Sequence, residues 1–310
     1  MLHSNYEKLI VLTQTPEAIE QSVDYLQTHM RHFLKENDQV LILLPDQRMP
    51  ICRILEQAIL KCDCTPVWAG EDQRWMTLLK TAFTTKCSCI VGRPLTLLGL
   101  SKLAKHMETP LFVTNVLMVG YPTTPWIVEG VRKNLDCMAW GCFDPLDGVV
   151  IGGFTCKQLD GAHIRSDVYS VEIEDEDGLP LLQGEPGRVI LYPNAEPELR
   201  VAVGDRGRLV TGSCACGSRE PKLVDVNAIQ PETEDVYQMG ESLLHWSSIL
   251  DCRLERTEYG MKMELVVFPG EKLPKLPTVA QRILRSFDPE KDMPFEHQKV
   301  LRKGFSVKKD

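Results

Sequence analysis

Four residues have the types and spacing of a zinc site. Cys214 and Cys216 form a C-x-C pair among turn-forming residues, which let both thiolates face one point. Cys156 and His163, with six residues between them, supply a further thiol and an imidazole. Zinc favours four tetrahedral nitrogen and sulfur ligands, so this Cys₃His set could close a structural site. On spacing alone, unliganded thiols and a surface histidine are an equal alternative.

The sequence around most of the other cysteines indicates buried thiols rather than metal ligands. The chain contains 11 cysteines, an odd number that does not suit a fully disulfide-paired scaffold. Cys62 with Cys64, and Cys87 with Cys89, lie in strand-like sequence, where alternate side chains point to opposite faces and cannot easily share a ligand. Cys142 comes at the end of the α/β run described next, where it could serve as a nucleophile or be a buried, inert thiol.

The first 120 residues alternate between helical and strand-like patterns. Apolar residues recur every three to four positions from Thr15 to Lys35, which predicts an amphipathic helix. Further strands are predicted at 40–44, 64–68, 89–91 and 111–119, and further helices at 51–61, 75–84 and 95–106. Strands separated by helices of about 10–15 residues indicate a parallel, helix-covered sheet. We therefore expect a doubly wound α/β domain.

The pattern changes near Asp144. Short strand-like segments at 168–173, 188–192 and 208–211 are separated by Gly, Pro and Asp turns, which predicts a mainly antiparallel β subdomain over residues 146–226. The acidic residues 172–177 are expected to form its solvated hairpin tip rather than a metal site.

A third pattern begins after the turn-rich segment 230–235. It predicts a helix at 243–252, a strand at 262–268 and a helix at 278–287, which together make a small α+β domain. We expect a large domain over residues 1–230 and a small C-terminal cap domain over 231–310, joined by a flexible connection.

Length and charge narrow the class of protein. The 310 residues are enough for about two domains. The 35 basic and 43 acidic residues give a formal charge of −8, which argues against broad affinity for nucleic acid or anionic membrane. The longest apolar run near the start is far shorter than the roughly 20 residues of a membrane helix. We expect a cytoplasmic protein.

Four segments resemble the adenylate-forming (AMP-dependent) ligases, most closely the phenylacetate–CoA ligase branch. They are residues 155–167, 184–189, 199–209 and 214–223; the third is similar to the family's Y-R-T-G-D-x-G-R-L segment and the fourth to its C-x-C-G-R-x-x-P-x-L. The resemblance implies a large α/β domain with a β subdomain, followed by a small α+β domain. It also implies ATP and Mg²⁺ as cofactors. A carboxylic acid would attack ATP to give an acyl-adenylate, and a thiol of CoA or a carrier protein would displace AMP.

The same resemblance implies roles for single residues. Asp205 matches the aspartate that holds the ribose hydroxyls of ATP, and Trp140 matches an aromatic residue bordering the adenine. Asp144 matches an acid that helps to hold magnesium. Lys299 falls where a lysine stabilises charge developing on the acyl and α-phosphate oxygens. The Cys₃His set falls where some members of this branch carry zinc, which favours a structural zinc ion.

The sequence departs from the family where phosphate should bind. The family's S-S-G-T-T-G-x-P-K loop would fall at 11–17, where this chain has no glycine to let backbone N–H groups approach phosphate and carries Glu17 instead. Phe143 replaces the family's threonine, and Ala202 replaces its arginine. The family's N-terminal layer is also missing, so a second copy or another chain could complete the large domain.

Two functions follow from these observations. One is a divergent ligase that activates an acyl or aryl acid. The other is a catalytically degenerate homologue that binds a ligand or a partner.

Overall fold

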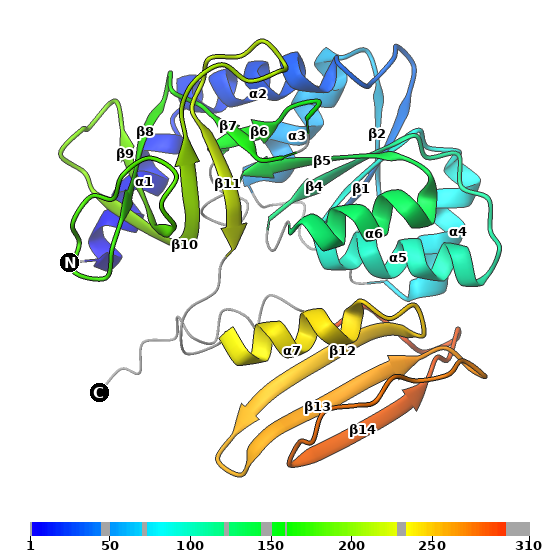
Figure 1. The fold of residues 1–310 in the computed structure, drawn as a ribbon. Helices are drawn as coiled ribbons and strands as arrows, with labels where there is room; N and C mark the ends of the chain where they lie inside the picture. Colours follow the sequence, from blue (N-terminus) through cyan, green and yellow to red (C-terminus); the bar gives the residue numbers. More distant parts are fainter. Residues whose placement is uncertain are drawn as a thin grey trace.

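The computed structural model describes residues 2–44, 50–69, 73–120, 124–143, 151–158, 160–227 and 234–295 (Figure 1). Within these residues the strands form one sheet of eleven strands and one of three. The predicted positions Asp144 and Lys299 and the predicted domain boundary at 230/231 lie outside the described residues. The boundary therefore stays a prediction.

The first half of the chain forms the parallel part of the large sheet. Its elements are β1 (Gln39–Leu43), α3 (Pro50–Lys61), β2 (Thr65–Trp68), α4 (Trp75–Thr85), β3 (Cys89–Gly92), α5 (Pro94–His106), β4 (Asn115–Val119), α6 (Pro125–Leu135) and β5 (Met138–Phe143). The strands lie in the order β2-β1-β3-β4-β5, and all neighbours are parallel. This confirms the predicted doubly wound α/β class.

The inner parallel strands β1, β3 and β4 are buried on both faces, as helix-covered strands must be, whereas the edge strand β2 is only partly buried. Leu41 and Leu43 of β1 belong to the cluster formed with α4, α5 and α6. Val40 and Ile42 belong to the cluster formed with α3 and with α2 (Pro16–Met30) on the opposite face. Alternate side chains along β1 therefore pack into two separate hydrophobic cores, one on each face of the sheet.

The N-terminus forms a helix that the sequence pattern did not predict. Helix α1 (Leu2–Thr13) ends just before α2, whose first turn is capped by Thr15: its hydroxyl accepts a hydrogen bond from the Ala18 backbone N–H at 3.2 Å. Leu9 of α1 is fully buried against the antiparallel part of the sheet. Asn5 donates from its side-chain amide to the Arg200 carbonyl at 2.8 Å.

The antiparallel subdomain continues the large sheet instead of forming a separate one. Its strands are β6 (Gly153–Thr155), β7 (Ala162–Ile164), β8 (Tyr169–Glu174), β9 (Gly187–Pro193), β10 (Val201–Val210) and β11 (Lys222–Asn227). They follow β5 in the order β6-β7-β11-β10-β9-β8, with every neighbour antiparallel. The predicted antiparallel character is confirmed. The predicted turn at 175–178 is also present, with Gly178 at φ +83°.

Two helices predicted in the C-terminal part of the chain are largely strands of the small sheet. Its elements are α7 (Glu234–Leu244), β12 (Ile249–Thr257), β13 (Gly260–Val267) and β14 (Gln281–Ser286). The predicted helix at 243–252 is wrong, because α7 ends at Leu244 and the following residues pair antiparallel with β13. The predicted helix at 278–287 is also wrong, because β14 pairs parallel with β13. Pairing with the central strand overrides the helix-like apolar spacing of these short segments. No helix in the described part of the chain is long and apolar enough to cross a membrane.

A candidate metal centre within a ligase fold

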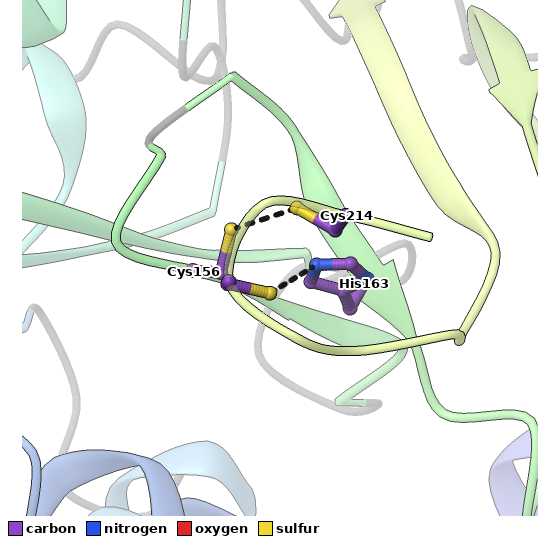
Figure 2. A group of neighbouring side chains, drawn as sticks. Cys156, His163 and Cys214 are labelled. Carbon is purple, nitrogen blue, oxygen red and sulfur yellow. Dashed lines mark hydrogen bonds between the residues drawn. The ribbon is translucent and has the colours of Figure 1, made fainter. Parts of the chain in front are cut away.

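The four predicted zinc ligands converge at one point of the antiparallel subdomain (Figure 2). Cys156 follows β6, His163 lies in β7, and the C-x-C pair lies in the loop between β10 and β11. Strand β7 pairs with β6 on one side and with β11 on the other, which brings the two halves of the motif together. The four ligand atoms all lie within 4.8 Å of one another.

The closest distances in the cluster suit a tetrahedral zinc ion. The Cys156 and Cys214 sulfur atoms are 3.7 Å apart, and the Cys216 sulfur lies 3.3 Å from His163 Nε2. Two thiolates each about 2.3 Å from a tetrahedral zinc would stand about 3.8 Å apart, and a thiolate and an imidazole nitrogen about 3.6 Å apart. The residues present therefore fit a closed structural site.

Hydrogen bonds around the cluster orient its ligands. The His163 ring is buried, and its Nδ1 lies 3.0 Å from the Glu220 carbonyl. A carbonyl can only accept, so Nδ1 carries the proton and Nε2 presents its lone pair to the cluster. The loop turns tightly through Gly217 at φ +97°, and the Cys214 backbone N–H donates to the Ser218 carbonyl at 2.9 Å. The turn brings both thiols of the C-x-C pair to the same side.

The thiols differ in acidity even without a metal. Hydrogen bonds lower the pKa of the Cys214 thiol to about 6; the largest effect comes from the Cys216 backbone, and smaller ones come from the neighbouring thiols and His163. Burial raises the pKa of Cys156 to about 11. The Cys214 thiolate can therefore accept a hydrogen bond from the Cys156 thiol, and one ligand of the set is already ionised near neutral pH.

The remaining cysteines behave as the sequence indicated. Cys62, Cys64, Cys87 and Cys89 are buried and not in disulfides. Cys142 is also buried, with 4% of its surface exposed, in β5. A nucleophile must be reached by its substrate, so this position favours the inert thiol over the catalytic alternative.

Trp140 lies in the core of the sheet. Its ring is 6% exposed and stacks on Phe33 with ring centroids 5.0 Å apart. Its indole N–H donates to the Asn115 side-chain oxygen at 3.1 Å. These contacts use one face of the ring and its only donor, and they fix the position of the ring against Phe33 and Asn115. Its predicted role beside an adenine stays a prediction.

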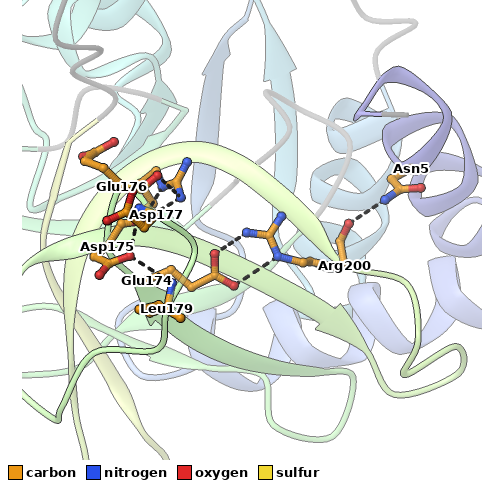
Figure 3. Close-up of polar contacts among 8 residues, drawn as sticks. Asn5, Glu174, Asp175, Glu176, Asp177, Leu179 and Arg200 are labelled. Carbon is orange, nitrogen blue, oxygen red and sulfur yellow. Dashed lines mark hydrogen bonds and ion pairs between the residues drawn. The ribbon is translucent and has the colours of Figure 1, made fainter.

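The predicted acidic hairpin tip contains one residue that sequence reasoning placed wrongly. Glu176 and Asp177 are exposed, as expected for a solvated turn. Glu174 is instead buried, with its side chain 4% exposed, and forms a bidentate ion pair with Arg200 (Figure 3). The Arg200 carbonyl also accepts the hydrogen bond from Asn5. One arginine thus joins β8, the start of β10 and α1, and no local sequence signal distinguishes Glu174 from its acidic neighbours.

Comparisons with known proteins identify the fold. No protein-family model and no curated protein sequence matches the chain. Among solved structures, 2-hydroxyisobutyryl-CoA ligase in the postadenylation state with R3-HIB-AMP aligns at a TM-score of 0.64 and 13% identity, covering 92% of this chain and 71% of that one. The chain has the fold of the AMP-forming ligases.

Two further solved structures agree on this AMP-forming ligase fold. The benzoate CoA ligase from Burkholderia xenovorans LB400 aligns at a TM-score of 0.57 and 11% identity, covering 89% of this chain and 65% of that one. The anthranilate CoA ligase AuaEII with anthranoyl-AMP aligns at 0.57 and 10%, covering 90% and 62%. The chain is shorter than these enzymes and spans 59% of the open conformation of 2-hydroxyisobutyryl-CoA ligase.

The segment 11–17, which the sequence resemblance predicts to correspond to the family's phosphate loop, spans the α1–α2 junction. Gln14 and Thr15 are the only residues between the two helices. The Thr15 hydroxyl occupies the Ala18 backbone N–H, and Pro16 has no backbone N–H to offer. The junction therefore leaves few donors for phosphate, in agreement with the sequence.

Two of the remaining ligase positions lie outside the described residues, and the third is described only in part. Asp144 and Lys299 are outside them, as noted above. Asp205 is described only as a position in β10, between the strand pairings at Ala202 and Arg206. Their catalytic roles stay predictions.

Proposed function

We propose that this chain is a divergent AMP-forming carboxylate ligase, which activates an acyl or aryl acid as an acyl-adenylate and passes it to a thiol such as that of CoA. The observation that best supports the proposal is the fold, which 92% of the chain shares with a CoA ligase structure that contains an acyl-AMP. In this proposal the acid carboxylate attacks the α-phosphate of ATP, pyrophosphate leaves, and the thiol then displaces AMP.

Each residue of the proposed site has a task that its chemistry suits. Asp205 would accept hydrogen bonds from both ribose hydroxyls, which a carboxylate can do at once. Asp144 would offer a hard oxygen ligand to Mg²⁺. Lys299 would place positive charge beside the oxygens that become more negative during transfer. Trp140 would border the adenine.

We also propose that the Cys₃His set holds a structural zinc ion. Four protein ligands leave no open position for a substrate, so the ion would stabilise the fold and take no part in the reaction. It would join β6 and β7 to the loop between β10 and β11. Asp205 lies in β10, the strand that enters this loop.

Acid-dependent exchange of labelled pyrophosphate into ATP tests the ligase proposal. We expect exchange with at least one member of a panel of aryl and fatty acids. Asp205→Ala should lower the exchange rate by about 100-fold, the equivalent of two charge-assisted hydrogen bonds of about 1.5 kcal/mol each. Lys299→Ala should lower it by about 100- to 1000-fold.

Two exposed residues provide matched controls for these variants. Asp177→Ala, at the hairpin tip, and Lys291→Ala, in the small domain, should exchange at the rate of the unsubstituted protein. Exchange that survives both Asp205→Ala and Lys299→Ala would refute the assigned roles.

The α1–α2 junction favours a second candidate function. A loop without glycine forfeits several hydrogen bonds to phosphate, each worth roughly 1.5–3 kcal/mol. A catalytically degenerate homologue would still bind an acyl or nucleotide ligand, or a partner chain, on the same fold. Calorimetry that detects binding of AMP, while no acid supports exchange, would favour this candidate over the ligase.

A further inference from the structure

Helix α7 and the small sheet share a hydrophobic core with the helices of the large sheet. In Figure 1, α7 lies between the layer of α5 and α6 and the three-stranded sheet. One continuous cluster of buried residues contains Leu103 of α5, Leu243 and Leu244 of α7, and Leu254 of β12. The small domain is therefore packed against the α4–α6 layer through apolar surface, and not only tethered to it by the chain.

A buried lysine lies at the centre of this contact. Lys102 of α5 is 6% exposed, and its ammonium group donates hydrogen bonds to three backbone carbonyls. They belong to Leu244, Trp246 and Ile249, and the latter two lie at 3.2 and 2.8 Å. Leu244 ends α7, Trp246 lies in the turn that follows, and Ile249 begins β12. An ammonium group has three N–H bonds, so every donor of Lys102 has an acceptor in the small domain.

The charge of Lys102 and the carbonyls around it favour this position of the small domain on the α4–α6 layer. The carbonyls at the C-terminal end of α7 carry the negative end of the helix dipole and have no partners within the helix. Burial lowers the pKa of Lys102 to about 8, so the group stays mostly protonated at neutral pH and keeps all three donors. A shifted or rotated small domain would leave the buried ammonium group without these acceptors.

Two further contacts, at the start of α4 and at the end of α5, join the small domain to the α4–α6 layer. The Trp75 backbone N–H at the start of α4 donates to the Asp292 carbonyl at 3.0 Å. The buried Asp292 carboxylate in turn accepts from Arg285 of β14 at 2.6 Å. At the end of α5, the His106 ring stacks on Phe268 with centroids 4.0 Å apart and planes at 14°. The contact therefore extends from the start of α4 to the end of α5.

We propose that Lys102 fixes α7 and the three-stranded sheet on the α4–α6 layer, so that the small domain and this layer open and move as one body. In this proposal the small domain is held against the large one, in contrast to the flexibly joined cap expected from the sequence. The inference rests on the contacts of Lys102 and its neighbours, and it holds whether or not the chain activates a carboxylic acid.

Hydrogen exchange of the full chain, followed by mass spectrometry, tests the proposal. In the unsubstituted protein, amides of α7 and β12 should exchange as slowly as those of α5, because the three elements open together. Lys102→Met keeps the length of the side chain but removes the ammonium donors from the three carbonyls. It should speed exchange in α7 and β12 at least about 10-fold while leaving β1, β3 and β4 unchanged.

Lys105→Met is the matched control. Lys105 is exposed on the same helix, and its ammonium group donates to the Asn134 side-chain oxygen at 3.5 Å. Its replacement should leave exchange in α7 and β12 as in the unsubstituted protein. The proposal is overturned by unchanged α7 exchange in a folded Lys102→Met variant. It is also overturned if α7 and β12 of the unsubstituted protein exchange orders of magnitude faster than α5, a comparison that needs no variant.

Discussion

Replacing Cys214 with serine is expected to remove bound zinc and to lower the midpoint of thermal unfolding by about 10 °C or more. A zinc ion held by four protein ligands contributes its binding free energy to folding, and a hydroxyl is a poor substitute for a thiolate. The loss should be large because the ligands join β6, β7 and the β10–β11 loop, which are otherwise linked by short strand pairings. A loss of several kcal/mol shifts the midpoint of a chain this size by this amount.

Metal analysis and calorimetry on the same preparations check this expectation. The unsubstituted protein should contain one equivalent of zinc, and the Cys214→Ser protein much less than one. Cys137→Ser is the control, because Cys137 is a buried thiol outside the cluster. It should keep its zinc despite a modest loss of stability. Full zinc occupancy in Cys214→Ser would contradict the Cys₃His site.

Replacing Arg200 with alanine is expected to lower the free energy of unfolding by about 3–5 kcal/mol. The Glu174 carboxylate would remain buried without its partner, which costs more than the ion pair itself contributes. The carbonyl contact to Asn5 is made by the backbone and should persist. Urea unfolding followed by circular dichroism measures the change.

Two further variants identify the cause of this loss. Adding Glu174→Gln to Arg200→Ala should recover a large part of it, because the unpaired charge is then gone. Arg206→Ala removes the exposed pair with Glu176 and should cost less than about 1 kcal/mol. If Arg200→Ala were as mild as Arg206→Ala, the buried pair would not support the subdomain as described.

The sequence predicted the parts of the fold that local patterns determine. Helical spacing located α2 to α5, and turn residues located the hairpin after Glu174. The strand β12 was missed because its first four residues, 249–252, are all buried and show no alternation. Its identity as a strand depends on hairpin pairing with β13, which the apolar spacing of the segment does not show.

The candidate site was also predictable only where local sequence patterns determine it. The zinc ligands could be predicted because C-x-C in a turn and a cysteine–histidine pair are recognisable types, strengthened by family resemblance. Their convergence required the pairing of β7 with β11, which the sequence did not predict. Lys102 and Glu174 gave no signal, because a charged residue in a helix or strand is normally exposed and only tertiary contacts show that it is buried.

The central claim, activation of a carboxylic acid, is tested most directly by measuring the products of the first step. The zinc-loaded protein is incubated with ATP, Mg²⁺, hydroxylamine and each acid of the panel. We predict AMP and the acyl hydroxamate in equal amounts, with both lost in Asp205→Ala. Hydroxylamine would take the acyl group from the adenylate and release AMP. If no acid yields AMP, or if ATP gives only ADP, the protein does not form an acyl-adenylate and the account of its function is contradicted.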